Sequence, residues 1–242
     1  MVWENRMVML VDGSATLRYY YGILLKRLDF TVTAAGSAEE ALAFLKDMLP
    51  SLILTELPLP GMSGIDFIRT IKGSDKTRRV PVIVFSDRED AEARAACLGM
   101  GCADFLIKNA EPGNIYRTME TALQPRPREH IRLSVPLKVV VGDGTAQGGA
   151  ARTEYATSIS EGGLYLRTLY PRPKNSFTPI SIFIKDRAIR ATASVLYNRP
   201  MEGGVFKEPG MGLKFVDLSP LDRSFLRRFI KEQLTSDITI GP

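Results

Sequence analysis

The sequence predicts two folded domains: an α/β domain with a doubly wound, five-stranded parallel sheet, followed by an antiparallel β-barrel that ends in a helix. Three observations predict this arrangement. Short apolar runs alternate with segments of helical period up to about residue 124. A segment with two prolines among arginines follows, and beyond it short strands are separated by glycine clusters. We place the domains at residues 1–124 and 125–242, with a linker at about 123–131.

The composition is that of an ordinary globular protein. Of the 242 residues, 45% are hydrophobic and 24% are charged, as is usual for folded domains. We find neither the roughly 18 consecutive apolar residues of a membrane-spanning helix nor a signal peptide, so we expect a cytoplasmic protein without membrane insertion. Two cysteines, Cys97 and Cys102, and one histidine, His130, predict no disulfide framework and no metal site.

The first domain reads as five strand–helix units. Strands covered on both faces are nearly all apolar, and such runs lie at residues 7–11, 31–35, 52–55, 81–85 and 104–107. Helices are expected near residues 16–27, 38–48, 64–72, 89–98 and 112–123. Ser37 with Glu40 forms a capping box, and Asp87 with Asp90 resembles one. Right-handed crossovers then place helices on both faces of the sheet.

The second domain reads as a series of short strands and one helix. The strands are rich in Val, Ile, Tyr and Thr and are expected at about 137–141, 152–158, 163–168, 180–184, 189–197 and 212–215. Ser219 followed by Pro220 and, two residues later, Asp222 predicts a helix that continues to about Leu234. Its apolar stripe is expected to pack on the barrel or on a partner and consists of Leu221, Phe225, Leu226, Phe229 and Ile230.

The two halves of the chain differ in charge. Residues 1–124 hold 14 Lys and Arg against 16 Asp and Glu, whereas residues 125–242 hold 18 against 11. A basic second half suits an anionic partner. Nucleic acid is an alternative that we reject, because the sequence shows no basic recognition helix and no aromatic stacking platform. We therefore expect no DNA binding.

Four polar residues follow or end the predicted strands of the first domain: Asp12, Glu56, Ser86 and Lys108. In an open parallel sheet, ligands bind at this carboxyl edge. The segments that carry these residues are Leu-Val-Asp-Gly-Ser at 10–14, Leu-Thr-Glu-Leu-Pro-Leu-Pro-Gly-Met-Ser-Gly at 54–64, Val-Phe-Ser at 84–86 and Phe-Leu-Ile-Lys at 105–108. Their order and spacing over residues 5–124 resemble the receiver domain of two-component response regulators.

The resemblance implies a phosphorylation pocket with missing parts. In the family, an aspartate after the third strand accepts a phosphoryl group, an acidic pair after the first strand binds Mg²⁺, and a Ser or Thr and a Lys contact the phosphate. Asp12, Ser86 and Lys108 match these positions, but Gly13 replaces the second acid and Glu56 replaces the acceptor. Because Mg²⁺ requires octahedral oxygen ligands and phosphoryl transfer requires the metal, we expect a pseudo-receiver that binds no Mg²⁺ and accepts no phosphoryl group.

Glu56 has two interpretations. It forms a structural ion pair with Lys108 at the sheet edge, or its carboxylate, one methylene longer than that of Asp, reaches Lys108 and Ser86 where a phosphoryl group would lie and acts as a fixed switch. Asn109 departs further from the family, which usually has proline at this position.

Three segments of the second domain are informative together. They are Arg-Glu-His-Ile-Arg at 128–132, Ser-Ile-Ser-Glu-Gly-Gly at 158–163, and Gly-Met-Gly-Leu-Lys-Phe at 210–215 before the last helix. Over residues 126–235 they resemble the PilZ domain, whose RxxxR and [D/N]xSxxG segments bind cyclic di-GMP. The resemblance assigns ligand binding to Arg126, Arg128, Arg132, Ser158, Ser160 and Gly163.

The chemistry of these residues suits this ligand. An arginine fork donates in parallel to phosphate oxygens or to a guanine edge and stacks on the base. Ser160 is expected to hydrogen-bond to the ligand, and Gly163 to leave room for a base. Ser158 departs from the Asp or Asn of the family, and a hydroxyl accepts more weakly from guanine, which costs about 1 kcal/mol.

These observations predict a non-enzymatic signalling protein: a cyclic di-GMP sensor, linked through the family to motility and biofilm formation, that relays its signal to a protein partner. A homodimer through residues 1–124 is a further expectation. The alternative is a PilZ-type scaffold that has lost its ligand, for which Ser158 argues. An active phosphate-accepting receiver is disfavoured by Gly13 and Glu56.

Overall fold

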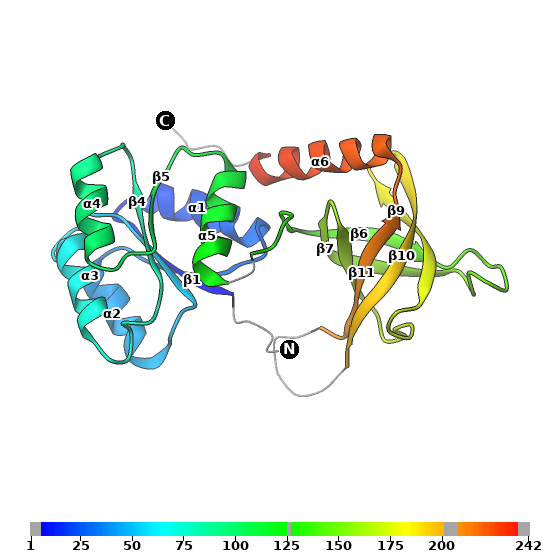
Figure 1. Cartoon of the computed structure of the whole chain (residues 1–242), viewed down its shortest axis with the longest axis horizontal. Coiled ribbons are helices and arrows are strands. Elements are labelled where there is room, and N and C mark those ends of the chain that lie inside the picture. The colour runs from blue at the N-terminus through cyan, green and yellow to red at the C-terminus, as the bar shows by residue number, and fades with distance from the viewer. Residues whose placement is uncertain (1–5, 125–126, 201–207, 237–242) are drawn as a thin grey trace. The chain divides into compact units, whose positions relative to one another are not determined.

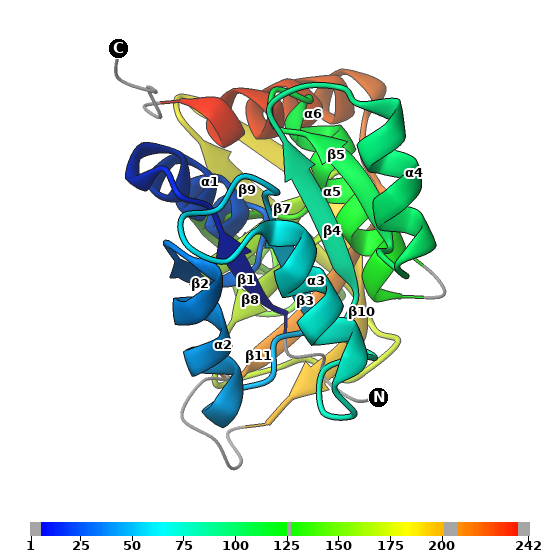
Figure 2. The ribbon, with the colours of Figure 1, turned by 90° about the vertical axis from the view of Figure 1, so that its left-hand side faces the viewer.

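The computed structural model describes residues 6–124, 127–200 and 208–236, and these form two compact units that divide after Glu129. The first unit contains the predicted five-stranded parallel sheet (Figure 1), with its strands in the order β2-β1-β3-β4-β5 (Figure 2). Its strands are β1 (Met7–Val11), β2 (Thr31–Ala35), β3 (Leu52–Thr55), β4 (Val82–Ser86) and β5 (Asp104–Ile107). Its helices are α1 (Ala15–Arg27), α2 (Ala38–Asp47), α3 (Gly64–Gly73), α4 (Ala91–Gly99) and α5 (Pro112–Leu123).

The strand register aligns the carboxyl ends of the parallel strands. Val11 of β1 pairs with Thr55 of β3, and Thr55 pairs in turn with Val84 of β4. On the far side Ser86 pairs with Ile107 of β5. The residues that follow β1, β3 and β5 therefore leave the sheet at one edge (Figure 2).

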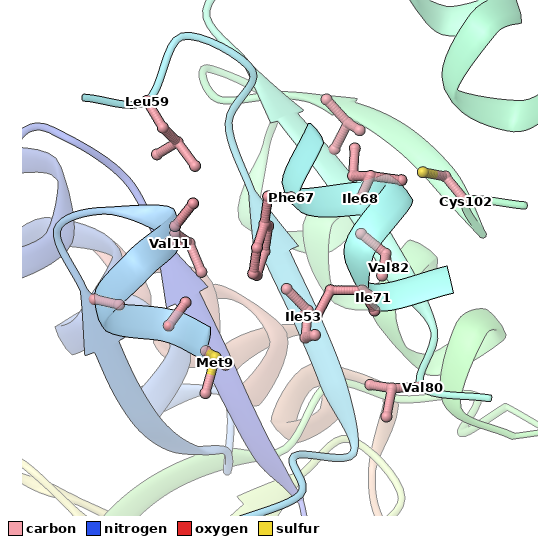
Figure 3. Close-up of a cluster of buried hydrophobic side chains, with 14 of the residues drawn as sticks. Met9, Val11, Ile53, Leu59, Phe67, Ile68, Ile71, Val80, Val82 and Cys102 are labelled. Carbon is pink, nitrogen blue, oxygen red and sulfur yellow. The ribbon is translucent and has the colours of Figure 1, made fainter. Parts of the chain in front are cut away.

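Helices cover both faces of this sheet, which explains why its central strands are apolar throughout. On one face, side chains of α2, α3 and α4 pack with those of β1, β3 and β4 in a cluster that includes Met9, Ile53, Phe67 and Ile71 (Figure 3). The other face packs on α1 and α5, where the Tyr21 ring meets Phe85 edge-on with centroids 4.6 Å apart.

Of the two helix starts predicted for the first unit, one is confirmed and the other is wrong. Ser37 caps α2 and accepts a hydrogen bond from the Glu40 N–H. At α4 the cap is Asp90, which accepts from the Ala93 N–H, so the helix begins at Ala91. Asp87 instead lies 3.2 Å from the Lys108 ammonium, which binds a carboxylate more strongly than a backbone N–H does.

The second unit is the predicted antiparallel barrel with a C-terminal helix. The barrel is closed, in the order β10-β11-β8-β7-β6-β9. Its elements are β6 (Leu133–Val141), β7 (Arg152–Ser160), β8 (Gly163–Arg167), β9 (Phe177–Ile184), β10 (Arg187–Arg199), β11 (Gly210–Asp217) and α6 (Pro220–Thr235).

Four strands of the second unit, β6, β9, β10 and β11, begin earlier than predicted. In β6 and β9 the reason is that a proline is tolerated at a special position in the strand. Pro136 lies in β6 where the pairing with β7 shifts register between Ser134 and Leu137, as in a bulge. Pro179 lies in β9 immediately before Ile180, and Ile180 is the first residue of β9 that pairs with β6. A missing N–H therefore removes no bond to β6 there.

Helix α6 packs against β6 and β7 of the barrel. Ser219 caps it as predicted, and Leu226, Phe229 and Ile230 are buried. The prediction is wrong for Leu221, whose side chain is 78% exposed. Leu221 precedes Leu226 by five residues, so it lies roughly 140° around the helix from the buried stripe.

Candidate functional site

The sheet edge of the first unit carries a compact group of charges around Lys108. The Lys108 Nζ lies 2.7 Å from Asp12 Oδ2, 2.8 Å from Glu56 Oε2 and 3.2 Å from Asp87 Oδ1. Asp12, Glu56 and Lys108 are buried. The structure thus brings together three of the four predicted residues and adds Asp87, which the sequence pattern assigned to a helix cap.

Gly13 and Glu56 fit one another. The Gly13 N–H donates to Glu56 Oε1 at 2.5 Å. A Cβ atom on residue 13 would lie 3.2 Å from that oxygen and 3.2 Å from Pro60 Cδ. The longer carboxylate of Glu56 therefore fills the space beside residue 13 and leaves little room for a second acidic side chain.

The carboxylates of this pocket already have other partners, with which a Mg²⁺ ion would have to compete. Both oxygens of Glu56 are engaged, by Gly13 and Lys108, and both oxygens of Asp12 are engaged, by the Ser14 N–H at 2.8 Å and Lys108. Mg²⁺ requires near-octahedral oxygen ligands at about 2.1 Å. Within the described parts of the chain, no group of three or more His, Cys, Asp or Glu is placed to hold a metal ion.

The electrostatics keep Lys108 protonated. Burial acts to lower the pKa of its ammonium, but hydrogen bonds and charges from Asp12 and Glu56 outweigh burial and raise the pKa above its ordinary value. Lys108 is thus a fixed positive charge, shared by three carboxylates, at the position where the family's lysine would contact a phosphate.

The loops around this cluster are held by other contacts. The Ser86 hydroxyl donates to the Arg88 carbonyl at 2.8 Å, so its bond goes to the loop after β4 and not to Glu56, which the fixed-switch interpretation had placed beside it. The Tyr21 hydroxyl of α1 donates to the Lys108 carbonyl. Asn109 lines an adjoining cavity of about 510 Å³ together with Tyr20 and Tyr21.

In the second unit, strand pairing joins two of the predicted ligand-binding segments. Ser134 pairs with Ser158 across β6 and β7. The His130 ring lies against the turn that joins β7 and β8, since a Cβ atom on Gly162 would lie 2.9 Å from His130 Cδ2. Arg132, which directly precedes β6, therefore lies at the same end of the barrel as this turn.

Ser160 and Gly163, which flank this turn, serve its local structure, and Ser158 is buried in β7. Ser158 and Ser160 are 7% and 9% exposed. The Ser160 hydroxyl donates to the Gly163 carbonyl at 3.1 Å. A Cβ atom on Gly163 would lie 2.0 Å from the Leu213 carbonyl oxygen of β11. Glycine is thus required for the close approach of β8 and β11, a reason different from the predicted space for a base.

Two arginines of helix α6 bind Glu161 in the same turn. No sequence pattern predicted these contacts. Arg227 donates to Glu161 Oε2 from Nε at 3.0 Å and from its terminal nitrogen at 2.8 Å. Arg223, one helical turn earlier, donates to the Glu161 carbonyl at 3.2 Å. The spacing of four between two arginines on a helix was the available signal, but nothing in the sequence paired them with Glu161.

Arg128 belongs to the first unit, whereas Arg132 belongs to the second. The Arg128 guanidinium lies 3.5 Å from Asp29 Oδ2, and its backbone N–H donates to Glu120 at 3.4 Å. Glu120 is fully buried and pairs with Arg6 at 2.6 Å. No sequence pattern pointed to Arg6, Asp29 or Glu120. Arg126, also predicted to bind the ligand, lies outside the described residues.

Comparison with protein families matches residues 8–120 to the response regulator receiver domain and residues 123–232 to the PilZ domain. The two-component response regulator ORR7 of Oryza sativa subsp. japonica is 35% identical over 118 residues, which cover 48% of this chain and 56% of that protein. ORR11 of Oryza sativa subsp. indica is 31% identical over 117 residues, covering 48% and 80%.

Solved structures that match cover the same half of the chain. A response regulator receiver protein from Pseudomonas putida is 30% identical and covers 50% of this chain and 99% of its own, with a TM-score of 0.46. The chemotaxis response regulator CheY4 of Vibrio cholerae is 21% identical, with coverages of 50% and 100% and a TM-score of 0.47. In the described part of the chain, no helix has the length and apolar character needed to cross a membrane.

Proposed function

Because this chain belongs to the response regulators and joins a receiver domain to a PilZ domain, we propose that it senses cyclic di-GMP while its receiver domain, as a pseudo-receiver, accepts no phosphoryl group. The chain is a signalling protein with a cyclic di-GMP-binding type of domain. We further propose that it acts in the cytoplasm, catalyses no reaction and relays the signal to a protein partner.

The observation that carries the sensor proposal is the meeting of two segments at one end of the barrel. Arg132 leads into β6, which pairs with β7 just before the turn that Ser160 and Gly163 flank. An arginine fork beside this turn offers paired donors to a phosphate or to guanine O6 and N7. The excess of basic residues in this half favours the same dianionic ligand.

The pseudo-receiver proposal rests on the carboxylate oxygens around Lys108. Glu56 occupies the place of the acceptor and already binds both Lys108 and the Gly13 N–H. Without a metal to neutralise the charge that develops, phosphoryl transfer loses its main stabilisation. The Glu56–Lys108 pair supports either a structural role or a fixed switch.

Isothermal titration calorimetry of the full chain with cyclic di-GMP tests the sensor proposal. Charge-assisted hydrogen bonds contribute about 1.5–3 kcal/mol each, so Arg132→Ala is expected to weaken binding by about ten- to a hundredfold. Arg132→Lys is also expected to weaken it, since lysine lacks the planar fork. Arg190→Ala, which removes an exposed arginine from β10, is the matched control and is expected to leave the affinity unchanged.

The second candidate is a scaffold that has lost its ligand. Ser158 supports this alternative, because a hydroxyl stands where the family has Asp or Asn and the side chain is only 7% exposed. Absence of binding at tens of micromolar ligand, both for the natural chain and for Ser158→Asp, decides for the scaffold.

A further inference from the structure

Arg128, the first arginine of the RxxxR segment, is held within the receiver unit. Its side chain is 25% exposed and lies 3.5 Å from the Asp29 carboxylate, which is 33% exposed. One terminal nitrogen of the Arg128 guanidinium is shielded from solvent. The Arg128 backbone N–H also donates to Glu120 Oε2 at 3.4 Å. Both the side chain and the backbone of Arg128 are therefore attached to acidic groups of the receiver.

The two acidic groups are themselves fixed. Asp29 lies between α1 and β2 in the left-handed region, with φ of 66°, and its carbonyl accepts from Arg6 Nε at 3.1 Å. Glu120 is fully buried and accepts from Gln124 at 3.2 Å besides pairing with Arg6. Arg128 thus meets a preformed acidic site.

Tyr116 of α5 is a third neighbour of Arg128, besides Asp29 and Glu120. Burial raises the pKa of its hydroxyl, and the charge of Glu120 raises it further, while the charges of Arg6 and Arg128 and a hydrogen bond with Arg128 act in the opposite direction. The guanidinium of Arg128 therefore lies against an aromatic hydroxyl as well as a carboxylate.

We propose that Asp29 is a positioning residue that lowers the affinity of the PilZ domain for cyclic di-GMP by holding Arg128 in the receiver. This inference rests on the proposed function. An N–H group that faces the Asp29 carboxylate is not available to a phosphate oxygen, and a carboxylate close to a phosphate repels it. Ligand binding through Arg128 must therefore displace Asp29.

The consequence is a coupling between the receiver and the ligand. If the Asp29–Arg128 contact lowers the affinity for the ligand, bound ligand weakens the Asp29–Arg128 contact by the same free energy, because such coupling is reciprocal. Cyclic di-GMP is thus expected to release Arg128 from Asp29, so that the receiver unit changes its contacts when the PilZ domain is occupied.

The first experiment measures cyclic di-GMP binding to the full-length variant Asp29→Asn by calorimetry. Asparagine tolerates the left-handed backbone at this position, so the substitution removes only the charge. A partly exposed ion pair contributes little, and we expect binding to become about two- to fivefold tighter. Asp75→Asn removes the carboxylate of an exposed pair with Arg78 and is expected to leave the affinity unchanged.

Repeating the substitution in an Arg128→Ala background distinguishes positioning from general electrostatics. The effect of Asp29→Asn is expected to vanish there, because Asp29 acts through Arg128. An equal gain in both backgrounds overturns the inference, as does unchanged or weaker binding of Asp29→Asn alone. If neither the natural chain nor any variant binds, the proposed function fails together with its regulation.

A second experiment tests the hold on Arg128 without ligand. Trypsin must take a free arginine side chain into its specificity pocket, so cleavage after Arg128 reports its release. In brief digestion followed by mass spectrometry, the ratio of cleavage after Arg128 to cleavage after Arg132 is expected to rise roughly twofold or more in Asp29→Asn but not in Asp75→Asn. An unchanged ratio overturns the hold even where the ligand binds.

Discussion

At Gly13 and Glu56 a hydrogen bond between the two residues stands where the receiver pattern has a metal-binding acid and an acceptor aspartate. Each departs from the receiver pattern, and in the structure they compensate for one another, because the Gly13 N–H binds the Glu56 carboxylate that fills the space beside it. We expect small phosphodonors with Mg²⁺ to leave the chain unmodified. An acid-labile phosphate on residues 1–124, detected by intact mass, contradicts this.

Restoring both acids tests whether the rest of the pocket is intact. Gly13→Asp alone is expected to lower the free energy of unfolding by about 1–3 kcal/mol, since it brings a second carboxylate against Glu56. Gly13→Asp combined with Glu56→Asp is expected to regain stability and to bind Mg²⁺, seen as a metal-dependent rise in Tm. If the double variant gains nothing from Mg²⁺, the loops at Asp87 and Asn109 have also diverged.

Ser158 offers a gain-of-affinity test. It pairs with Ser134 of β6 and with Tyr165 of β8, so residue 158 has a defined place on the strand. Ser158→Asn supplies a stronger acceptor for guanine and is expected to tighten cyclic di-GMP binding by about two- to twelvefold in calorimetry. Ser134→Asn on the neighbouring strand is the control, and an equal gain there argues against a specific contact.

At the scale of elements, a buried charge pair joins helix α5 to Arg6, the residue before β1. Glu120 is fully buried, and the Arg6 side chain that meets it at 2.6 Å is 10% exposed. Glu120→Gln keeps the shape but leaves Arg6 buried without its counter-charge, so we expect the receiver to lose about 3–5 kcal/mol of stability in urea unfolding. Glu89→Gln, in the exposed loop before α4, is expected to change stability little.

The central strands β1 and β3 were predictable because burial on both faces leaves an apolar run. β1, β2, β3, β5 and α5 have the predicted ends. The misplaced strand starts at Pro136 and Pro179 depend on register and on where a neighbouring strand ends, and local sequence does not specify either property. The competition between Asp87 and Asp90 for the α4 cap depends on Lys108, a residue of another strand.

The candidate sites were predictable in part for the same reason. The group around Lys108 follows from strand ends that meet at one edge of the sheet. The contacts of Arg128 with Asp29, and of Glu161 with Arg227, join segments far apart in sequence. The folded structure determines which carboxylate each arginine contacts. The residues next to these arginines in sequence therefore do not predict the pairing.

At the scale of the whole molecule, we expect the receiver half to act as a dimerisation surface. Leu98 on α4 is 42% exposed, and the last two strand–helix units are the usual contact face of the family it resembles. Light scattering of the full chain is expected to give a dimer, and Leu98→Asp is expected to shift it to monomer.

Leu49→Asp serves as the control for this test, because Leu49 is 45% exposed but lies beyond α2. It is expected to leave the dimer intact. A monomer at every concentration of the natural chain, or equal effects of the two substitutions, goes against dimerisation through this face.

The three carboxylates around Lys108 also have a consequence for how long the protein's signal lasts. An active receiver stores its signal as a covalent bond, and the lifetime of that bond sets how long the response lasts after the stimulus ends. In the function proposed above, Glu56 is paired with Lys108 and no phosphoryl bond forms. The duration of the response therefore does not depend on the lifetime of such a bond, and no phosphodonor is consumed. Its response then follows the dissociation rate of the bound nucleotide, so the signal ends as fast as the messenger leaves.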